Sequence, residues 1–346
     1  MILTVKEIIH ETDDAVSVVL KNNSFFNKIK YKAGQFLTVK IPFKNKIEKR
    51  AYSFSSSPVT DKFLKITVKK VKEGLVSNYI CNSLKAGQKL EIEKPAGSFF
   101  IEPDKNAKIK YVLFAAGSGI TPIFSIIRTV LEKEPLSSIV LIYANRDERS
   151  IIFKKHLEDL SQLYADRFAV EHILEKNQND ASNYHQDLLN EELTTDILTK
   201  HDLQYSDGKY MMCGPPGFME QAKKILANNG IQRNRIKLEA FKADFVTSSD
   251  AKDLLSNVTL YFDNKKHTLD VPGDKTILQA ALSNNILLPY SCRSGMCSSC
   301  KAKCVTGEVK MIDGHFLSDD EVAEGSILTC VSFPKSSTIG ISFMND

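Results

Sequence analysis

Four cysteines lie within fourteen positions of the chain, in the segment SCRSGMCSSCKAKC at 291–304, and a fifth stands alone at Cys330. The N-terminal residues lack the basic start and unbroken apolar run of an export signal, so we expect a cytoplasmic protein with reduced thiols. Cysteines packed this densely then indicate metal binding or redox chemistry over disulfides. A metal held by this group would tie a loop to a distant segment, which constrains the C-terminal fold.

The cysteine spacing is typical of a 2Fe-2S centre of the plant type. Four residues separate Cys292 from Cys297, two separate Cys297 from Cys300, and 29 lie between Cys300 and Cys330. In that pattern three thiolates come from one loop and the fourth from a distant strand. Gly295 and the serines of the loop would let backbone N–H groups approach an anionic cluster. The predicted ligands are therefore Cys292, Cys297, Cys300 and Cys330.

Two other metal sites compete with this interpretation. Cys297, Cys300 and Cys304 have the spacing that ends a bacterial 4Fe-4S run, but Val305 stands where that run has proline. Structural zinc usually needs two short cysteine pairs, and only one is present here. We prefer the 2Fe-2S centre and interpret Cys304 as a packed strand residue on the same face as Ala302.

The hydrophobic pattern changes twice along the 346 residues. Residues 1–103 alternate apolar and polar positions between Gly, Pro and Ser clusters, which predicts an antiparallel β-barrel or sandwich. Residues 104–243 alternate buried strands with helices, which predicts a doubly wound parallel α/β domain. A polar linker at 244–255 then leads to a third domain at 256–346, with a hairpin, one helix and the cysteine loop.

Charge and hydropathy exclude two classes of partner. The formal net charge is +4, with eight Lys/Arg against ten Asp/Glu in residues 255–346, and no concentrated basic patch that would indicate nucleic acid. The apolar stretch 111–131 is interrupted by Gly-Ser-Gly, Thr-Pro and Arg128, so we predict a strand, a turn and a helix in place of a membrane span.

The C-terminal region resembles plant-type ferredoxins over roughly 90 residues, from LPYSCRSGMCSSCKAKCVTGEV to FLSDDEVAEGSILTCVSFP. The resemblance implies a β-grasp (α+β) fold with the cluster near the surface. Cys304 occupies a position where that family usually has an aliphatic residue, which agrees with its interpretation as a packed side chain.

The segment RAYSFSSSP at 50–58 resembles the Arg-x-Tyr-Ser signature of the ferredoxin-NADP reductase superfamily, whose barrel binds FAD. By this resemblance Arg50 and Ala51 belong to the flavin site, with Arg50 on the pyrophosphate. Tyr52 would lie against the isoalloxazine and Ser53 near flavin N5, and both are candidate catalytic residues. An ordinary strand with an exposed Arg and a packed Tyr is the alternative.

Two further segments of the superfamily pattern suit pyrophosphates at helix starts. In VKKVKEGLVSNYI the resemblance assigns Val68, Lys69, Gly74, Val76 and Ser77 to FAD. In AAGSGITP we expect Gly117, Ser118 and Gly119 to form the nicotinamide dinucleotide turn. Thr121 is expected there as the N-cap of the following helix and Pro122 as its first residue.

The nicotinamide end of the site is carried by MCGPPGFM, which resembles the Cys-Gly-Pro motif of the superfamily. Cys213 would lie beside the hydride path as a third catalytic residue, with Gly214 and Pro215 shaping the loop; a buried structural thiol is the alternative. The segment LEAF matches the place where the reductase portion of the superfamily ends with an acidic residue and an aromatic residue near the flavin. By this resemblance Phe241 is expected to lie near the flavin. An arginine after the second strand can bind the 2′-phosphate of NADPH, and Arg146 stands there, followed by the acids Asp147 and Glu148. We therefore expect NADPH over NADH.

The motifs follow the superfamily order over almost the whole chain, so the chain resembles the reductase components of bacterial multicomponent oxygenases, including those of phenylacetyl-CoA epoxidases. NAD(P)H gives two electrons and a 2Fe-2S centre accepts one, so FAD is expected between them. The expected partner is an oxygenase component, with a di-iron protein as one candidate. Asp319, Asp320, Glu321 and Glu324 are candidate docking residues, and a solvated helix face is the alternative. A reductase of general acceptors and a non-enzymatic redox sensor are the rival functions.

Overall fold

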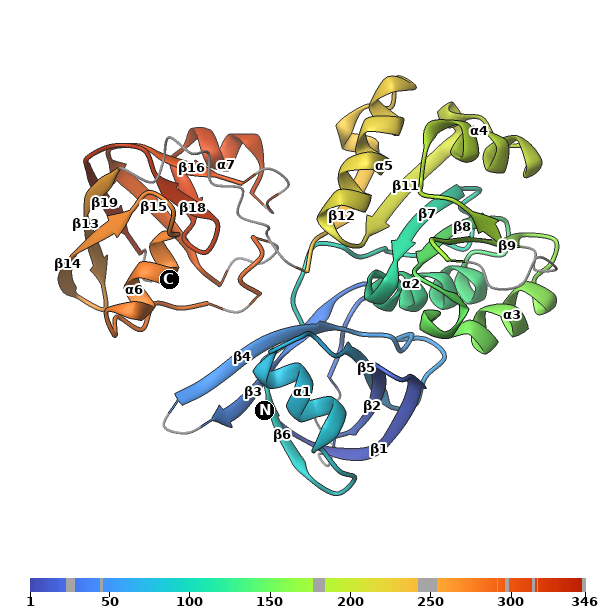
Figure 1. The fold of residues 1–346 in the computed structure, drawn as a ribbon, viewed down its shortest axis with the longest axis horizontal. Helices are drawn as coiled ribbons and strands as arrows, with labels where there is room; N and C mark the ends of the chain where they lie inside the picture. The colour runs from blue at the N-terminus through green and yellow to red at the C-terminus, as the bar shows by residue number, and fades with distance from the viewer. Residues whose placement is uncertain are drawn as a thin grey trace. The chain divides into compact units, whose positions relative to one another are not determined.

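The computed structural model describes residues 1–22, 29–43, 46–176, 184–241, 254–290, 292–295, 299–312, 315 and 317–343. The chain divides into two compact units, Met1–Glu239 and Ala240–Asp346. Its sheets confirm the predicted fold class, with an antiparallel barrel, a parallel α/β domain and a β-grasp domain (Figure 1). Most of the predicted linker lies outside the described residues, and the domain boundaries stay predictions.

The first sheet is the antiparallel barrel, with strand order β4-β3-β6-β1-β2-β5. Its strands are β1 (Ile2–Thr12), β2 (Ala15–Lys21), β3 (Phe36–Phe43), β4 (Lys46–Ser53), β5 (Leu64–Lys69) and β6 (Lys89–Ile92). A bridge between Phe54 and Ile66 connects the two edge strands and closes the sheet. Helix α1 (Leu75–Asn82) buries Val76 and Ile80 against the barrel core.

The second sheet is parallel throughout, with strand order β10-β9-β8-β7-β11-β12. Its strands are β7 (Lys110–Ala116), β8 (Ser138–Asn145), β9 (Phe168–Leu174), β10 (His185–Gln186), β11 (Gly208–Cys213) and β12 (Ile236–Glu239). The short 3-10 turns are η1 (Gly117–Gly119), η2 (Glu148–Ser150), η3 (Tyr205–Asp207) and η4 (Arg233–Arg235). After Lys110 every residue of β7 is buried, as expected for a strand covered on both faces.

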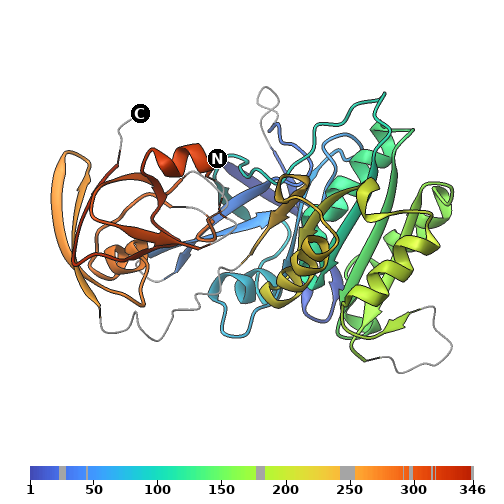
Figure 2. The same cartoon turned by 90° about the horizontal axis from the view of Figure 1, so that it is seen from above.

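Helices cover both faces of this parallel sheet. They are α2 (Ile120–Lys133), α3 (Lys154–Leu163), α4 (Glu191–Lys200) and α5 (Pro216–Asn228). Helices α2 and α3 share one core cluster with alternate residues of β7, β8 and β11, while Figures 1 and 2 show α4 and α5 on the opposite side. The stretch 111–131 is a strand, a turn and a helix, as predicted, and no described helix is long and apolar enough to cross a membrane.

Hydrogen bonds between buried hydroxyl groups join the barrel to α2. The Ser57 and Thr129 hydroxyls lie 2.8 Å apart, and the Ser125 hydroxyl donates to the Ser56 carbonyl at 2.6 Å. Arg128 of α2 forms an ion pair with Asp61. These contacts explain why the serine-rich segment after β4 is buried although it is polar, because buried hydroxyls need partners.

The third sheet belongs to the second unit and has strand order β14-β13-β19-β15-β17. Its strands are β13 (Leu255–Phe262), β14 (Lys265–Pro272), β15 (Lys301–Thr306), β17 (Ser326–Leu328) and β19 (Thr338–Ser342), beside a pair formed by β16 (Val309–Met311) and β18 (Ser332–Pro334). Helix α6 (Ile277–Ser283) begins at a Thr276–Gln279 capping box and packs its apolar residues into this core. The last helix is α7 (Asp319–Ala323).

Candidate active site

The end of barrel strand β4 meets the end of sheet strand β12. Ser53 is the last residue of β4 and Glu239 the last of β12, and both are buried. The Ser53 hydroxyl donates a hydrogen bond of 3.3 Å to the Glu239 carboxylate. The predicted flavin motif therefore reaches the carboxyl edge of the parallel sheet, where α/β proteins usually bind nucleotides.

Cys213 lies at the same edge of the sheet. It is the last residue of β11 and pairs with Glu239 in the parallel register of β11 and β12. Burial, and then the neighbouring Glu239 carboxylate, raise the pKa of the Cys213 thiol well above its usual value. The thiol is therefore neutral at physiological pH, so it can pack against a ligand without adding charge.

The predicted Gly-rich turn contacts this same edge. A Cβ added to Gly119 would lie 2.0 Å from the Cys213 carbonyl oxygen, so only glycine allows the turn to approach β11. Gly117 has φ of +51°, and its carbonyl accepts a hydrogen bond of 3.1 Å from the buried Tyr143 hydroxyl. Ser118 lies between these glycines in η1. The predicted dinucleotide turn and the Cys-Gly-Pro segment are therefore in direct contact.

The predicted cap of α2 is wrong. The helix begins at Ile120 with Gly119 as N-cap, so Thr121 and Pro122 both lie inside its first turn. Pro122 is tolerated because first-turn N–H groups have no intrahelical acceptor. The Thr121 hydroxyl is buried and has no hydrogen-bond partner among the described residues. An unpartnered buried hydroxyl beside a glycine turn fits a pyrophosphate or ribose ligand.

At the loop after β11, Gly214 and Pro215 shape the start of α5. A Cβ on Gly214 would approach the Ala116 Cβ to 3.0 Å, and Pro215 is the N-cap of the helix. This geometry agrees with the structural role that the sequence predicted for them.

The flavin motif lies along β4 on the barrel. The Arg50 guanidinium donates to the Glu48 carboxylate at 3.0 Å and to the Lys49 carbonyl at 2.7 Å. Ala51 is half-buried beside it, and Tyr52 packs against the barrel core, where burial raises the pKa of its hydroxyl. The partly exposed Arg50 side chain thus remains within reach of an anionic ligand.

The start of α1 is an open helix N-terminus. Gly74 is its N-cap and makes no side-chain capping bond, so the first-turn N–H groups, including those of Val76 and Ser77, have no intrahelical acceptors. The Ser77 hydroxyl accepts from the Val71 N–H at 3.2 Å and donates to the Gly74 carbonyl. Such N–H groups suit the pyrophosphate of FAD.

Strand β5 connects this flavin region to the Gly-rich turn. Val68 is fully buried in the barrel core. The Lys69 ammonium lies 3.6 Å from the Asp14 carboxylate and 3.8 Å from the Cβ position of Gly117. The two predicted nucleotide sites are therefore adjacent.

Two predicted residues are exposed, and one of them, Arg146, shares the Asp14 carboxylate with Lys69. The Arg146 guanidinium is 64% exposed and lies 3.7 Å from the Asp14 carboxylate. Phe241 is 42% exposed and belongs to the second unit, so its predicted place near the flavin stays a prediction.

In the second unit the cysteine loop converges on Cys330. Hydrogen bonds to the sulfurs of Cys292 and Cys300, together with burial, raise the pKa of the Cys330 thiol. The Ser294 N–H donates to the Cys292 sulfur at 3.4 Å. Among the described residues no set of three His, Cys, Asp or Glu side chains has metal-binding geometry. The fourth predicted ligand, Cys297, lies outside the described residues.

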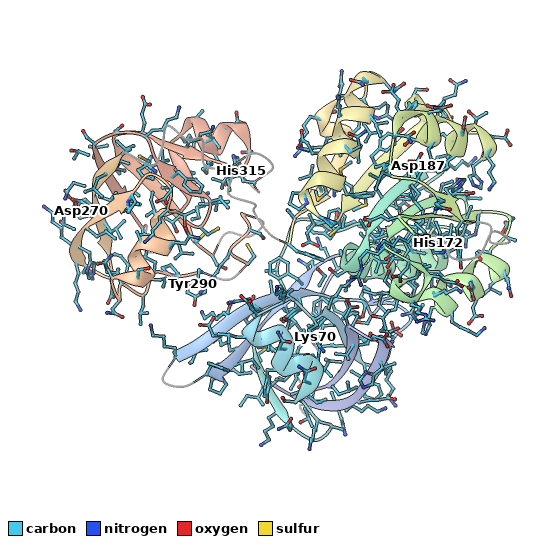
Figure 3. The ribbon with its side chains drawn as sticks, viewed as in Figure 1. Lys70, His172, Asp187, Asp270, Tyr290 and His315 are labelled. Atoms are coloured by element: carbon cyan, nitrogen blue, oxygen red, sulfur yellow. The ribbon has the colours of Figure 1, made fainter. Side chains whose placement is uncertain are left out.

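The backbone of this loop suits an anionic cluster. Arg293 and Gly295 have φ of +58° and +76°, the left-handed geometry that occurs in anion-binding backbone nests. The Arg293 guanidinium lies 4.3 Å from the ring centroid of Tyr290, which Figure 3 labels. Cys304 lies in β15, half-buried against the core, with its sulfur 3.5 Å from the Thr306 carbonyl. Its position agrees with the interpretation of Cys304 as a packed strand residue.

Sequence reasoning missed Glu239, although it carried over Phe241 from the same LEAF segment. Its signal was the acid of that segment, which alone does not distinguish a buried site residue from a solvated one. Tyr143, which holds the Gly117 turn, was also missed because its strand reads as ordinary sheet core.

Comparison with known families matches three parts of the chain. Residues 2–101 match the oxidoreductase FAD-binding domain and residues 113–224 the oxidoreductase NAD-binding domain. Residues 260–335 match the 2Fe-2S iron-sulfur cluster binding domain. Each match contains the motifs from which the same cofactor was predicted.

Relatives and solved structures extend over the whole chain. The ferredoxin reductase component of 3-ketosteroid-9-alpha-monooxygenase from Rhodococcus rhodochrous is 35% identical, with 99% of this chain and 97% of the relative covered. One of the subunits of 1,2-phenylacetyl-CoA epoxidase from Escherichia coli K12 is 31% identical, with 99% and 97% covered. The structure of phthalate dioxygenase reductase matches with a TM-score of 0.64 at 23% identity, with 99% and 98% covered.

Proposed function

We propose that this chain, which belongs to the ferredoxin-NADP reductase superfamily with a C-terminal 2Fe-2S ferredoxin domain, delivers electrons to an oxygenase component. It is an NAD(P)H-dependent oxidoreductase whose cofactors are FAD, NAD(P)H and a 2Fe-2S cluster. When bound, FAD and the cluster together convert a two-electron donation into single-electron delivery. The chain supplies the binding and orientation that this exchange needs.

The observation that carries the proposal is the meeting of Ser53, Cys213 and Glu239 at one edge of the parallel sheet. Ser53 comes from the flavin motif and Cys213 from the nicotinamide motif, so the two ligands would meet there. The Ser53 hydroxyl holds its proton towards Glu239, and the neutral Cys213 thiol packs without charge beside the hydride path. The buried edge would also exclude water from that path.

The remaining residues divide between the two nucleotides. Arg50, Ala51, Tyr52, Val68, Lys69, Gly74, Val76 and Ser77 would hold FAD, and Gly117, Ser118, Gly119, Thr121, Pro122, Gly214 and Pro215 would hold the nicotinamide dinucleotide. Arg146 is exposed at the end of β8 and would take the 2′-phosphate of NADPH. The ratio of kcat/KM for NADPH to that for NADH tests this preference, and a ratio below one would reject it.

The cluster ligands would be Cys292, Cys297, Cys300 and Cys330, because thiolates are the usual ligands of iron-sulfur centres. The convergence of Cys292 and Cys300 on Cys330 supports this set. An absorbance spectrum with flavin bands but no iron-sulfur contribution would contradict it.

We propose that the electron acceptor is an oxygenase component and, more specifically, a di-iron protein. The relatives serve a 3-ketosteroid monooxygenase and a phenylacetyl-CoA epoxidase, and their identities to this chain are similar. Of the predicted docking acids, Glu321 is engaged within its own unit, since it pairs with Lys301 at 2.7 Å and caps α7 through Ser318. Asp320 and Glu324 are exposed and remain available for a partner.

The deciding experiment measures NADPH oxidation with ferricyanide, with free ferredoxin and with candidate oxygenase components. Saturable stimulation of product formation by one oxygenase component supports the proposal. Equal rates with every acceptor would favour a general reductase, and slow NADPH oxidation with all acceptors would favour a redox sensor.

A further inference from the structure

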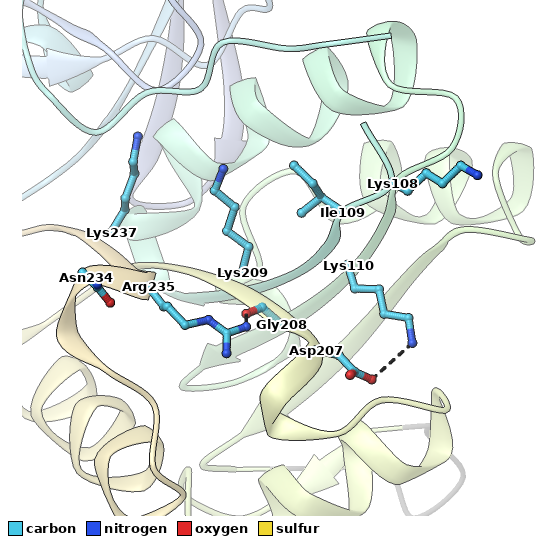
Figure 4. A pocket seen from close by; sticks show the side chains of 9 residues that line it. All are labelled: Lys108, Ile109, Lys110, Asp207, Gly208, Lys209, Asn234, Arg235 and Lys237. Carbon is cyan, nitrogen blue, oxygen red and sulfur yellow. Dashed lines mark hydrogen bonds and ion pairs between the residues drawn. The ribbon is translucent and has the colours of Figure 1, made fainter. Parts of the chain in front are cut away.

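A basic hollow lies at the amino edge of the parallel sheet, where β7, β11 and β12 begin. It has a volume of about 550 Å³, and its charged lining residues are Lys108, Lys110, Asp207, Lys209, Arg235 and Lys237. Five cations and one carboxylate thus line a single concave surface (Figure 4). This excess of positive charge is unusual in a chain whose formal net charge is only +4.

Only some of these cations form ion pairs or hydrogen bonds within the hollow. Lys110 pairs with Asp207 at 3.2 Å, and Figure 4 shows its side chain turned towards that carboxylate. The Arg235 guanidinium donates to the carbonyls of Ser206 and Gly208 at 2.7 and 2.6 Å. Neutral carbonyls fix the direction of the guanidinium, and its charge interacts with the Asp207 carboxylate, which also pairs with Lys110.

Lys209 and Lys237 have no carboxylate partner among the described residues. Lys209 lies 5.8 Å from the ring centroid of Tyr111, and Lys237 donates to the Phe100 carbonyl at 2.9 Å. Figure 4 shows both side chains extending in the same direction from neighbouring strands. The Lys209 and Lys237 side chains therefore extend from the same face of the neighbouring strands β11 and β12.

Like charges accumulate around Lys237. Its ammonium and that of Lys32 lie 5.4 and 4.2 Å from the ring centroid of Phe100. Burial, followed by the charge of Lys209, lowers the pKa of Lys237. The Glu102 carboxylate, which pairs with Lys32, acts in the opposite direction, and Lys32 itself has a smaller lowering effect. Gathering these cations costs stability in the free protein, and a bound anion would offset that repulsion.

The hollow is separate from the proposed nicotinamide site. Lys110 begins β7 and Ala116 ends it, and the Gly117 turn follows directly. Six residue steps along a parallel strand span about 20 Å. The two sites therefore occupy opposite edges of the same sheet.

We propose that this hollow binds a compact phosphate-bearing polyanion, with Lys209 and Lys237 as its main ligands and Lys108 and Arg235 at its rim. A concave space of this size fits a small molecule with two or more negative charges, such as a diphosphate. Ammonium and guanidinium groups are the usual protein ligands of phosphate. The proposal does not depend on the identity of the electron acceptor.

The test measures pyrophosphate binding to the FAD- and cluster-loaded protein by calorimetry at constant ionic strength. Saturating NADP+ is present throughout to occupy the dinucleotide site. The double variant Lys209→Gln/Lys237→Gln is expected to bind pyrophosphate at least about tenfold more weakly than the wild type. The control Lys85→Gln/Lys89→Gln removes the same charge from exposed barrel positions and is expected to bind like the wild type.

Three results would overturn the proposal: no saturable binding by the wild type, equal weakening in both double variants, or weaker binding with NADP+ present than in a parallel titration without it. A poly-glutamate peptide serves as a further probe, and tighter binding of that peptide than of pyrophosphate would also overturn it, in favour of an acidic protein surface. Thermal unfolding of both double variants shows whether each is folded. If Lys209→Gln/Lys237→Gln does not fold, pyrophosphate binding by the single variant Lys209→Gln is compared with that of the wild type instead.

Discussion

The Ser53 hydroxyl donates a hydrogen bond to the Glu239 carboxylate across 186 positions of sequence. This bond joins the flavin motif of the barrel to the last strand of the parallel sheet. Its geometry leads to the first of five predictions.

Ser53→Ala removes the hydroxyl that lies between the two nucleotide motifs. We expect the rate of flavin reduction by NADPH to fall roughly tenfold, equivalent to about 1.4 kcal/mol. Stopped-flow absorbance of the flavin measures this rate. Ser55→Ala is the control, because Ser55 is also a buried hydroxyl but bonds Thr67 inside the barrel. Equal rates in the two variants would show that the Ser53–Glu239 bond has no part in the reaction.

Gly119→Ala tests the close approach of the Gly-rich turn to β11. Gly119 has φ of −60°, so alanine costs nothing in backbone conformation, but its Cβ would lie 2.0 Å from the Cys213 carbonyl oxygen. We expect KM for NADPH to rise and stability to fall by about 1–3 kcal/mol. Gly217→Ala is the control, because nothing lies within 4 Å of its Cβ position in α5, and it should stabilise the protein slightly. Unchanged NADPH kinetics in Gly119→Ala would refute the contact.

Cys330→Ser and Cys304→Ser distinguish the ligand sets of the cysteine loop. Serine is a poor ligand for iron, so Cys330→Ser should lose most of its iron and its iron-sulfur absorbance. Cys304→Ser should keep both, because the Cys304 sulfur faces the carbonyls of Thr306 and Gly307. Iron content per flavin measures the difference. Loss of iron in Cys304→Ser with retention in Cys330→Ser would reverse the assignment.

Glu171→Gln tests a buried ion cluster in the α/β domain. Burial alone would raise the pKa of Glu171, but hydrogen bonds from Lys200, His185 and His201 lower it to about 2. Since the folded pKa lies below the ordinary value of 4.5, the stabilisation is complete above pH 4.5 and is lost as pH falls towards 2. We expect the variant to lose about 2–3 kcal/mol near neutral pH.

Chemical denaturation between pH 3 and pH 7 measures this effect. The stability difference between wild type and Glu171→Gln should shrink as the pH decreases. The exposed Glu175→Gln has the same charge change and should show no such difference. A constant difference across the pH range would refute the linkage.

Asp320→Asn/Glu324→Gln tests the proposed docking acids of α7 without disturbing Glu321, which holds the helix N-terminus. We expect slower electron delivery to the oxygenase component at low salt and little effect at high salt, because exposed charges mainly steer association. The control Asp263→Asn/Asp274→Asn removes two acids elsewhere in the unit. Partner turnover that matches the wild type at low salt would dismiss the docking role.

Local sequence determined the cofactors and the fold class of this protein. The cysteine spacing, the Arg-x-Tyr-Ser and Cys-Gly-Pro segments and the change from alternating strands to strand-helix pairs are all short-range signals. They can be read without the fold because each reflects the geometry of one loop, one turn or one element.

Only the tertiary structure decided how these segments combine. It placed the buried serines after β4 against α2, moved Thr121 from the expected cap into the helix, and brought Glu239 to Ser53. Each of these outcomes depends on packing between elements far apart in the chain. The sequence around Glu239 indicates only an acid near the end of the reductase portion, whereas burial of its carboxylate arises because the barrel packs against that edge of the sheet.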